Sequence, residues 1–203
     1  MASRIEEFDE EILYHAKREF LEKGYNDASL RNIASAACVS TSTIYTRYVD
    51  KEGLFSFIVK PAYDSFIGYV KRSLAGFEEL PSDEQLTCKD ELSDSGFNGL
   101  IDILYSHFDE FKLIVQKSPS NYYRDFLEQI VELDMQCTRC FLLSSESSAY
   151  KEGRINDGFL HVVSSAFYSG VFEVVIHDMP RKEAETYINE LRNFYNNGWK
   201  DYF

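Results

Sequence analysis

The stretch that most constrains this chain covers residues 29–51, SLRNIASAACVSTSTIYTRYVDK, where a turn of about three residues separates two short helical patterns. Ser29 is a good N-cap for the first helix, because its side-chain oxygen can accept a hydrogen bond from a free backbone N–H group. Ile33, Ala34 and Ala37 give that helix one face of small or apolar side chains. The stretch therefore predicts two helices joined by a tight turn.

The second helical pattern, which Ser40 can cap, has two different faces. Ile44 and Tyr48 lie four residues apart on the inner face, whereas Thr41 and Tyr45 form a second pair that points elsewhere. A helix that is buried on one side and rich in hydroxyl groups on the other suits insertion into the major groove of DNA. The spacing alone is equally compatible with an ordinary helical hairpin in a protein core. The polar side chains that accompany the outer pair are Ser42, Thr43, Thr46 and Arg47.

Apolar side chains recur with a helical period along most of the remaining chain, which predicts an all-α fold of about nine helices. The first helix covers residues 4–23 and ends at Gly24, because glycine readily adopts the left-handed conformation that follows many helices. Asp50 can cap a long helix over residues 51–75, which Pro61 can kink because it removes one backbone hydrogen bond. Further helices are predicted over 83–93, after Gly96, around 108–115, and over 122–147, 158–178 and 182–199.

The composition is that of a globular protein, since 44% of the 203 residues are hydrophobic and 27% are charged. No apolar run approaches the roughly 18 residues that suggest a membrane span, and the polar start MASRIEEFDEE is not a signal peptide. The four cysteines lack the density of a secreted disulfide scaffold. We therefore expect a soluble, cytoplasmic protein that has no contact with a membrane.

Acidic residues are concentrated in the later part of the chain. The formal net charge is −13, but residues 1–60 hold 8 basic and 10 acidic side chains, whereas the remainder holds 13 and 24. This excess of negative charge argues against nucleic-acid binding over the whole surface. A DNA contact at the N-terminal end must therefore be small and local, and it should weaken as the salt concentration rises.

Other chemistry is poorly supported by the sequence. Cys137 and Cys140 have metal-ligand spacing, but the sequence offers no second such pair and zinc needs about four ligands. His107 and Glu110 can form one edge of a metal site, again without a second copy. No phosphate-binding glycine loop and no nucleophile motif is present. We expect no metal, no cofactor and no catalytic residues.

Many residues of the first helices also match a known pattern in type and order: Ala16, Phe20, Gly24, Tyr25, Ser29, Ile33, Ala34, Ala37, Cys38, Val39, Ser40, Thr43, Ile44, Tyr45, Tyr48, Lys51, Glu52 and Leu54. This pattern resembles the N-terminal domain of TetR-family transcriptional repressors. The rest of the chain resembles the family only in the number and lengths of its helices. Cys38 stands where the family usually has a glycine, and Ser42 replaces a frequent second glycine. Cys38 therefore implies either a slightly strained turn or a turn with an ordinary φ.

The resemblance implies a helix-turn-helix DNA-binding domain over residues 1–50. It implies an effector-binding and dimerisation domain over residues 51–203, with 51–75 as the connecting helix. Capping is an alternative role for Ser29 and Ser40, and core packing is the favoured role of Tyr48. The positions implied in DNA binding are Ser29, Arg31, Ser40, Thr41, Ser42, Thr43, Tyr45, Arg47, Tyr48 and Lys51.

The implied contacts differ in what they touch. Thr41, Ser42 and Tyr45 are expected to face the groove or its edges. Arg31 and Arg47 can reach either bases or the backbone, and an arginine on guanine is the most informative possibility. The phosphate contacts are expected from Ser29, Thr43 and Lys51, the last with help from a helix N-terminus.

The resemblance implies dimerisation through the last two long helices, which the sequence supports independently. Small residues recur four apart in the first of these helices and let another helix approach closely. The alternative is an intramolecular core that uses the same residues. The expected dimer interface comprises Ser165, Ala166, Ser169, Gly170, Val174, Tyr187, Leu191, Phe194 and Tyr195.

A ligand pocket within the middle helices is likewise implied. An aromatic cavity with a few polar groups is one use of the side chains in this region, and plain core packing is the other. The sequence does not identify the ligand. The expected lining residues are Tyr105, His107, Phe111, Tyr122, Tyr123, Phe126 and Cys137.

Together these features predict a ligand-responsive transcriptional repressor that binds a palindromic operator in double-stranded DNA as a homodimer. An unidentified small-molecule effector is expected to release it from DNA. An alternative keeps DNA binding but replaces the small molecule with a protein partner or with no effector. A remote alternative is an α-helical enzyme built around His107.

Overall fold

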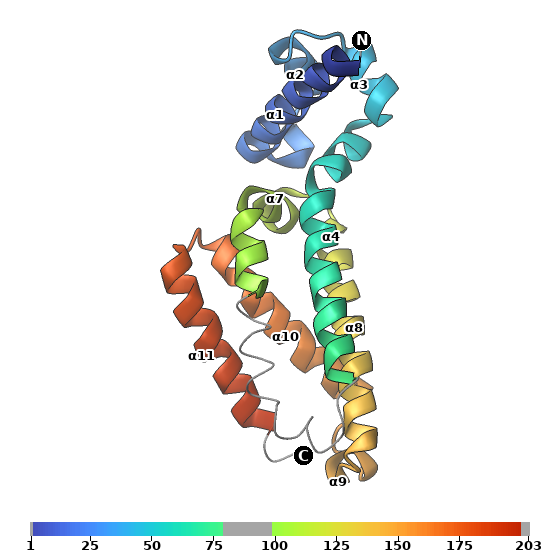
Figure 1. Ribbon diagram of the computed structural model, residues 1–203, viewed down its shortest axis with the longest axis vertical. Coiled ribbons are helices and arrows are strands. Elements are labelled where there is room, and N and C mark those ends of the chain that lie inside the picture. Colours follow the sequence, from blue (N-terminus) through green and yellow to red (C-terminus); the bar gives the residue numbers. More distant parts are fainter. Residues whose placement is uncertain (1, 79–98, 200–203) are drawn as a thin grey trace. The chain divides into compact units, whose positions relative to one another are not determined.

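The computed structural model describes residues 2–78 and 99–199, with side chains from residue 9 to 76 and from 99 to 199. Every element of secondary structure in this described part is a helix, which confirms the all-α prediction (Figure 1). The helix predicted over 83–93 lies outside the described residues. The chain divides into two compact units, one formed by Met1–Asp64 with His107–Tyr123 and the other by Ser65–Ser106 with Arg124–Phe203. The predicted domain boundary at residue 50 stays a prediction.

The N-terminal unit begins with α1 (Ala2–Asp27), whose last turn is interrupted at Gly24. Gly24 has φ 75° and ψ 168°, a conformation that costs glycine little because it has no Cβ. The helix predicted to end there does end its regular course at this residue. Beyond it, the Tyr25 ring stacks on Phe20 and meets Phe55 edge-on, with centroids 6.1 and 5.5 Å apart.

Three further helices complete the first part of this unit: α2 (Leu30–Ala36), α3 (Thr41–Tyr48) and the start of α4 (Lys51–Glu78). Asp50 caps α4 as predicted, because its carboxylate accepts the backbone N–H of Gly53 at 2.7 Å. The shared core consists of fully buried side chains from these helices, which fixes their mutual packing: Ile12, Ala16, Phe20, Ile33, Ile44, Leu54 and Phe55.

A short segment from later in the chain belongs to the same unit. It contains α7 (Phe108–Lys112) and the π-helical turn η1 (Leu113–Lys117), close to the helical piece predicted around 108–115. η1 packs against α1, and Phe111 is fully buried. On the surface, Lys17 of α1 pairs with Glu110 at 2.8 Å.

The C-terminal unit contains the end of α4, helical residues 99–106, α8 (Tyr122–Ser144), α9 (Ser148–Lys151), α10 (Asp157–Ile176) and α11 (Arg181–Trp199). Phe66, Phe126 and Phe172 meet in its core, with ring centroids 5.2 to 5.7 Å apart. Each comes from a different helix, so this aromatic contact joins α4, α8 and α10.

The end of α8 differs from the sequence-based expectation of a helix to residue 147. The helix ends at Ser144, and Glu146 adopts a left-handed φ of 55°. A left-handed residue terminates a helix even when it is not a glycine, so the sequence carried no clear stop signal here. Ser147 then caps the unpredicted helix α9 by accepting the backbone N–H of Tyr150.

The apolar character of α10 corrects a second expectation. Its 20 residues include a window with a mean hydropathy of 1.6, so by length and composition this one helix of the described chain can cross a membrane. The prediction that no run approaches such a length is therefore wrong for this segment. Its apolarity has a packing cause, because α10 buries side chains on several faces, among them Leu160, Tyr168, Val171, Phe172 and Val175.

Candidate nucleic-acid interface

The turn between α2 and α3 is held by backbone hydrogen bonds and contains a left-handed cysteine. The N–H of Val39 donates to the carbonyl of Ala34 at 2.9 Å, which closes the end of α2. Cys38 has a φ of 53°. The turn therefore keeps the conformation that glycine adopts most easily, and of the two possibilities for Cys38 the strained one holds. A non-glycine residue in this conformation costs roughly 1–2 kcal/mol.

A cluster of hydroxyl groups forms the start of α3. Ser40 caps the helix as predicted, because its Oγ accepts the backbone N–H of Thr43 at 3.2 Å. The same Oγ lies 2.7 Å from the hydroxyl of Ser42 and 2.9 Å from that of Thr43. Further along, the hydroxyl of Thr46 donates to the carbonyl of Ser42 at 2.8 Å. Ser40, Ser42 and Thr43 are thus brought together at the N-terminus of α3.

The two faces of α3 have the expected burial. Ile44 is fully buried and Tyr48 nearly so, whereas 52% of Tyr45 is exposed. Ser42 and Thr46 are also exposed, and Thr41 is half-buried. We call Thr41, Ser42, Tyr45 and Thr46 the outer face of α3.

Arg47 and Tyr48 are bound to an acidic residue of α1. The Arg47 guanidinium forms an ion pair with Asp9, and the Tyr48 hydroxyl donates to the same carboxylate at 3.2 Å. Burial, together with the nearby negative charge of Asp9, raises the pKa of Tyr48 to about 12. Asp9 therefore fixes the inner side of α3. Nothing in the sequence distinguishes Asp9 from the many other acidic residues of the first helix.

Lys51 is also engaged within the unit. Its ammonium group donates to the carbonyls of Asn26 and Ala28, each at 3.1 Å, and lies 4.7 Å from the centre of the Tyr25 ring. A cation at this place satisfies carbonyl groups at the end of α1 and stabilises the negative end of its dipole. An ammonium group has three N–H donors, and two of those of Lys51 point to carbonyls.

The start of α2 is capped differently from the prediction. Ser29 occupies the N-cap position with φ −116°, but its side chain makes no capping bond. Instead its backbone N–H donates to the carboxylate of Glu19 at 3.1 Å, and the same carboxylate oxygen accepts Asn32 at 3.1 Å and Lys23 at 2.8 Å. Burial alone would raise the pKa of Glu19, but these hydrogen bonds together lower it. Arg31, at the same end of α2, is exposed and forms no ion pair with a described residue.

A strained residue also follows α3. Val49 has φ 70° and ψ −56°, the rare form of the three-residue turn, and the N–H of Asp50 donates to the carbonyl of Tyr48 at 2.8 Å. Val49 is 76% exposed, so no burial of its side chain offsets this strain. Close packing accompanies the turn, since a Cβ at Gly53 would overlap the carbonyl oxygen of Tyr48.

The arrangement of these helices matches a known family. Residues 12–57 match the model of the family described as bacterial regulatory proteins, tetR family. The matched segment includes α2, the turn and α3, and it confirms the resemblance seen in the sequence. This chain is a TetR-family regulator. It is therefore a DNA-binding regulator of transcription.

Solved structures with a similar fold cover both units. PfmR, a TetR-family regulator from Thermus thermophilus, gives a TM-score of 0.57 at 18% identity, over 89% of this chain and 96% of that chain. A regulator of the TerR/AcrR family from Aquifex aeolicus gives a TM-score of 0.58 at 16% identity, over 92% of this chain and 99% of that chain. SmeT, the repressor of the Stenotrophomonas maltophilia multidrug efflux pump SmeDEF, gives a TM-score of 0.56 at 14% identity, over 90% of this chain and 87% of that chain. At these identities the likeness shows the fold alone. Comparison with curated proteins gave no match.

The expected ligand-pocket residues of this TetR-family chain do not lie together in one unit. His107, Phe111, Tyr122 and Tyr123 belong to the N-terminal unit, whereas the other three belong to the C-terminal unit. Phe111 and Phe126 are fully buried core side chains, and Cys137 is 5% exposed. The Tyr105 hydroxyl donates to the carbonyl of Met179 at 2.6 Å. Their role in ligand binding stays a prediction.

The expected dimer residues have two kinds of surroundings. Val174 is fully buried, and the Tyr187 hydroxyl donates to the carbonyl of Gly170 at 3.1 Å. A Cβ at Gly170 would lie 3.0 Å from Leu191, so α10 and α11 approach each other closely within the chain. By contrast, Phe194 is 76% exposed. Part of the set therefore serves the intramolecular core, as the alternative prediction from the sequence states.

Proposed function

We propose that this regulator is a repressor that binds a palindromic operator as a homodimer and is released by a small-molecule effector. The observation that carries the DNA-binding part of this proposal is the outer face of α3. It presents hydroxyl groups and a half-exposed tyrosine on a helix whose other side is anchored in a core. A rigid helix with such a face is what major-groove recognition requires.

In this proposal the residues of α3 and its flanks divide the work. Thr41, Ser42 and Tyr45 read the edges of bases in the groove, where hydroxyl groups and apolar rings discriminate between base pairs. Thr43 and Ser29 contact phosphates. Arg31, which is exposed, reaches bases or the backbone from the start of α2.

Arg47 and Lys51 act from positions that are already fixed. Two N–H donors of Lys51 point to protein carbonyls, so its phosphate contact uses the third. Arg47 forms an ion pair with Asp9, and its contact with a phosphate or a base is made in addition to that ion pair. Tyr48 contributes by packing.

An apolar surface on the last two helices supports the homodimer. Val162 of α10 is 64% exposed and Phe194 of α11 is 76% exposed, and Ala166 of α10 is exposed as well. A groove of about 510 Å³ along these helices is lined by Phe159, Phe194 and Trp199 among others. Large apolar side chains on one face commonly mark an interface, and a two-fold dimer would bury both copies of this face.

Release by an effector requires a difference in affinity between two states of the dimer. We propose that the ligand favours one relative orientation of the two DNA-binding domains, because a ligand shifts only equilibria in which it binds one state better. α4, which continues from the N-terminal into the C-terminal unit, is the proposed connection. Half-sites about one helical turn apart fix the spacing that such a change would disturb.

The test is selection and sequencing of DNA fragments bound by the purified protein, followed by gel-shift titration of the recovered site. A palindrome is expected, with half-sites about one helical turn apart. Tyr45→Ala should weaken binding of that site at least tenfold, since one lost groove contact has that order of effect. Tyr14→Ala is the matched control, because Tyr14 is an equally exposed tyrosine of α1.

Equal affinity of the wild type and Tyr45→Ala would place the groove contact elsewhere. A monomer in sedimentation at micromolar concentration would contradict the dimer.

A further inference from the structure

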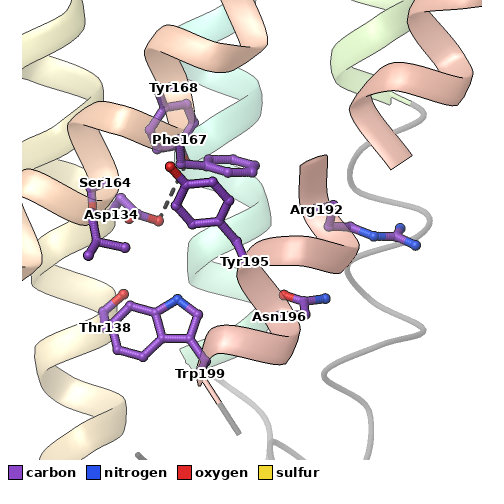
Figure 2. A pocket seen from close by; sticks show the side chains of 10 residues that line it. Asp134, Thr138, Ser164, Phe167, Tyr168, Arg192, Tyr195, Asn196 and Trp199 are labelled. Carbon is purple, nitrogen blue, oxygen red and sulfur yellow. Dashed lines mark hydrogen bonds between the residues drawn. The ribbon is translucent and has the colours of Figure 1, made fainter. Parts of the chain in front are cut away.

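A cavity of about 150 Å³ lies between α8, α10 and α11 of the C-terminal unit (Figure 2). Its volume is that of a cavity known to hold a benzene-sized molecule. Residues from all three helices line it, so it is a product of their packing. The lining includes Asp134 of α8, Ser164, Phe167 and Tyr168 of α10, and Tyr195 and Trp199 of α11.

Asp134 is an acidic side chain with only neutral partners. Its carboxylate accepts the hydroxyl of Ser164 at 2.6 Å and that of Tyr168 at 3.4 Å. No basic side chain of the described chain forms an ion pair with it. Burial raises the pKa of Asp134 above its ordinary value, and it raises that of Tyr168 even more strongly. A carboxylate in such a place carries a desolvation cost that two neutral donors compensate only in part.

The basic side chain that lines the cavity does not supply a positive charge to Asp134. Arg192 lines the cavity, but its guanidinium points away from Asp134 (Figure 2). Aromatic rings form a large part of the remaining lining, together with the polar side chains of Thr138 and Asn196. The Phe167 ring meets the rings of Tyr168 and Tyr195 edge-on, with centroids 5.3 and 5.0 Å apart. The indole of Trp199 lines the same cavity (Figure 2).

We propose that this cavity binds a small organic cation, an amine that carries about one ring, with Asp134 as its counter-ion. The ammonium group takes the position next to the carboxylate, and the hydrocarbon part lies against the rings of Phe167, Tyr195 and Trp199. Aromatic faces attract cations as well as apolar groups, so both ends of such a molecule find a suitable surface. The bound cation neutralises the charge that the protein leaves uncompensated.

Other ligand classes fit this cavity less well. An anion of the same size would meet the carboxylate of Asp134, and like charges in a partly desolvated site repel each other. A neutral molecule would fill the space but would leave the carboxylate uncompensated. We also assign this cavity as the effector site; that assignment rests on the proposed function, whereas cation binding does not.

The chain contains a single tryptophan, Trp199, whose fluorescence reports on this cavity and on the groove beside Phe159 and Phe194; the Asp134 variant described below distinguishes the two. We expect benzylammonium to produce a saturable change in that fluorescence at neutral pH. Benzyl alcohol has nearly the same shape but no charge. Its affinity should be lower by a factor of about ten or more, a difference typical of one charge contact. Equal affinity for the two molecules, or no saturable change with either, would overturn the proposal.

Asp134→Asn tests the counter-ion directly, because it removes the charge and keeps the shape. The variant should lose the preference for benzylammonium over benzyl alcohol. Asp125→Asn, an exposed change on the same helix with the same effect on net charge, should keep it. An unchanged preference in Asp134→Asn would assign the binding to another group. If Asp134→Asn fails to fold by circular dichroism, the comparison of the two ligands on the wild type decides the question.

DNA release is measured separately, by gel shift of the selected operator with benzylammonium added. Saturable fluorescence without release supports the cation site and contradicts its role as the effector site. Release without a cation preference at Trp199 supports an effector and contradicts this location for it.

Discussion

The two units of this regulator treat their charged side chains differently. In the N-terminal unit, Arg47 pairs with Asp9, Lys51 donates to two carbonyls, and Glu19 accepts three hydrogen bonds. In the C-terminal unit, Asp134 faces a cavity with hydroxyl partners alone. The charged groups Arg47, Lys51 and Glu19 are thus satisfied within the N-terminal unit, although the exposed Arg31 is not, whereas Asp134 in the C-terminal unit has no cationic partner among the described residues. A preorganised surface suits recognition of a fixed shape such as DNA, and an uncompensated site suits a response to binding.

The largest effect is expected where the preorganised surface is packed most tightly. Gly53→Ala places a Cβ against the carbonyl of Tyr48, and a backbone atom cannot move aside as a side chain can. We expect a loss of about 3 kcal/mol in the free energy of unfolding, measured by urea denaturation. Gly76→Ala is the control in the same helix, since nothing lies within 4 Å of its added Cβ.

That control should stabilise the protein by up to about 1 kcal/mol, because alanine favours a helix over glycine. Equal effects of the two substitutions would show that α3 and α4 are not in tight contact at Gly53.

The same substitution should have opposite effects in the two units. Asp9→Asn removes the ion pair with Arg47, and we expect it to lower the free energy of unfolding by about 1–2 kcal/mol. Asp134→Asn removes a half-buried charge that has no cationic partner and should raise that free energy by about 1 kcal/mol. Both are read from urea denaturation at neutral pH without added amines. Destabilisation of the same size by both would remove the contrast between the units.

The pH dependence of stability should differ in sign as well. The pKa of Glu19 is lowered by folding, so its stabilising contribution exists above its ordinary pKa and is lost as the pH falls through the lower value. The pKa of Asp134 is raised by folding, so its ionisation removes stability as the pH rises from the ordinary value through the raised one. Denaturation midpoints between pH 3 and 7 measure both contributions when the wild type is compared with Glu19→Gln and Asp134→Asn.

At neutral pH, Glu19→Gln should be less stable than the wild type, and Asp134→Asn should be more stable. Both differences in the free energy of unfolding should become smaller as the pH falls. Each is expected to span about 1 kcal/mol. Two difference curves of the same sign would contradict the assignment of either group.

The smallest effect is expected at the turn before α3. Cys38→Gly relieves a left-handed cysteine, and we expect a gain of about 0.5–1 kcal/mol after the added entropy of the unfolded chain is counted. Cys140→Gly is the control, since Cys140 is an exposed cysteine inside α8 and glycine there should destabilise by a similar amount. Thermal denaturation measures both. A loss of stability in Cys38→Gly would show that its thiol makes a contact of greater value than the strain.

The sequence predicted the local features of this molecule and missed the distant ones. The helical period, the break at Gly24 and the caps of Ser40 and Asp50 follow from residues within a few positions of each other, so they can be recognised in a single sequence. Asp9 and Arg47 are 38 residues apart, and Ser164 and Asp134 are 30 apart. Such pairs depend on how the helices pack against one another. The helical period of a sequence predicts the helices but not this packing.

The same distinction explains the errors at single positions. Ser29 has the right residue type and backbone for a capping side chain, but Glu19, ten residues earlier, reached its N–H group instead. Glu146 ends α8 in a left-handed conformation that its residue type does not announce. In both places tertiary packing decided between local options that the sequence left open.

Helix α3 lies between two strained residues, Cys38 at φ 53° and Val49 at φ 70°. In the genetic code, cysteine and valine codons each become a glycine codon by one base change, so a more relaxed backbone is a single mutation away at either end of α3. Most such proteins are selected for sufficient stability and not for the greatest stability. Single-base changes to glycine at position 38 or 49 would alter the flexibility of the backbone at the ends of α3. Such variants are therefore expected among the first to arise under selection on this regulator.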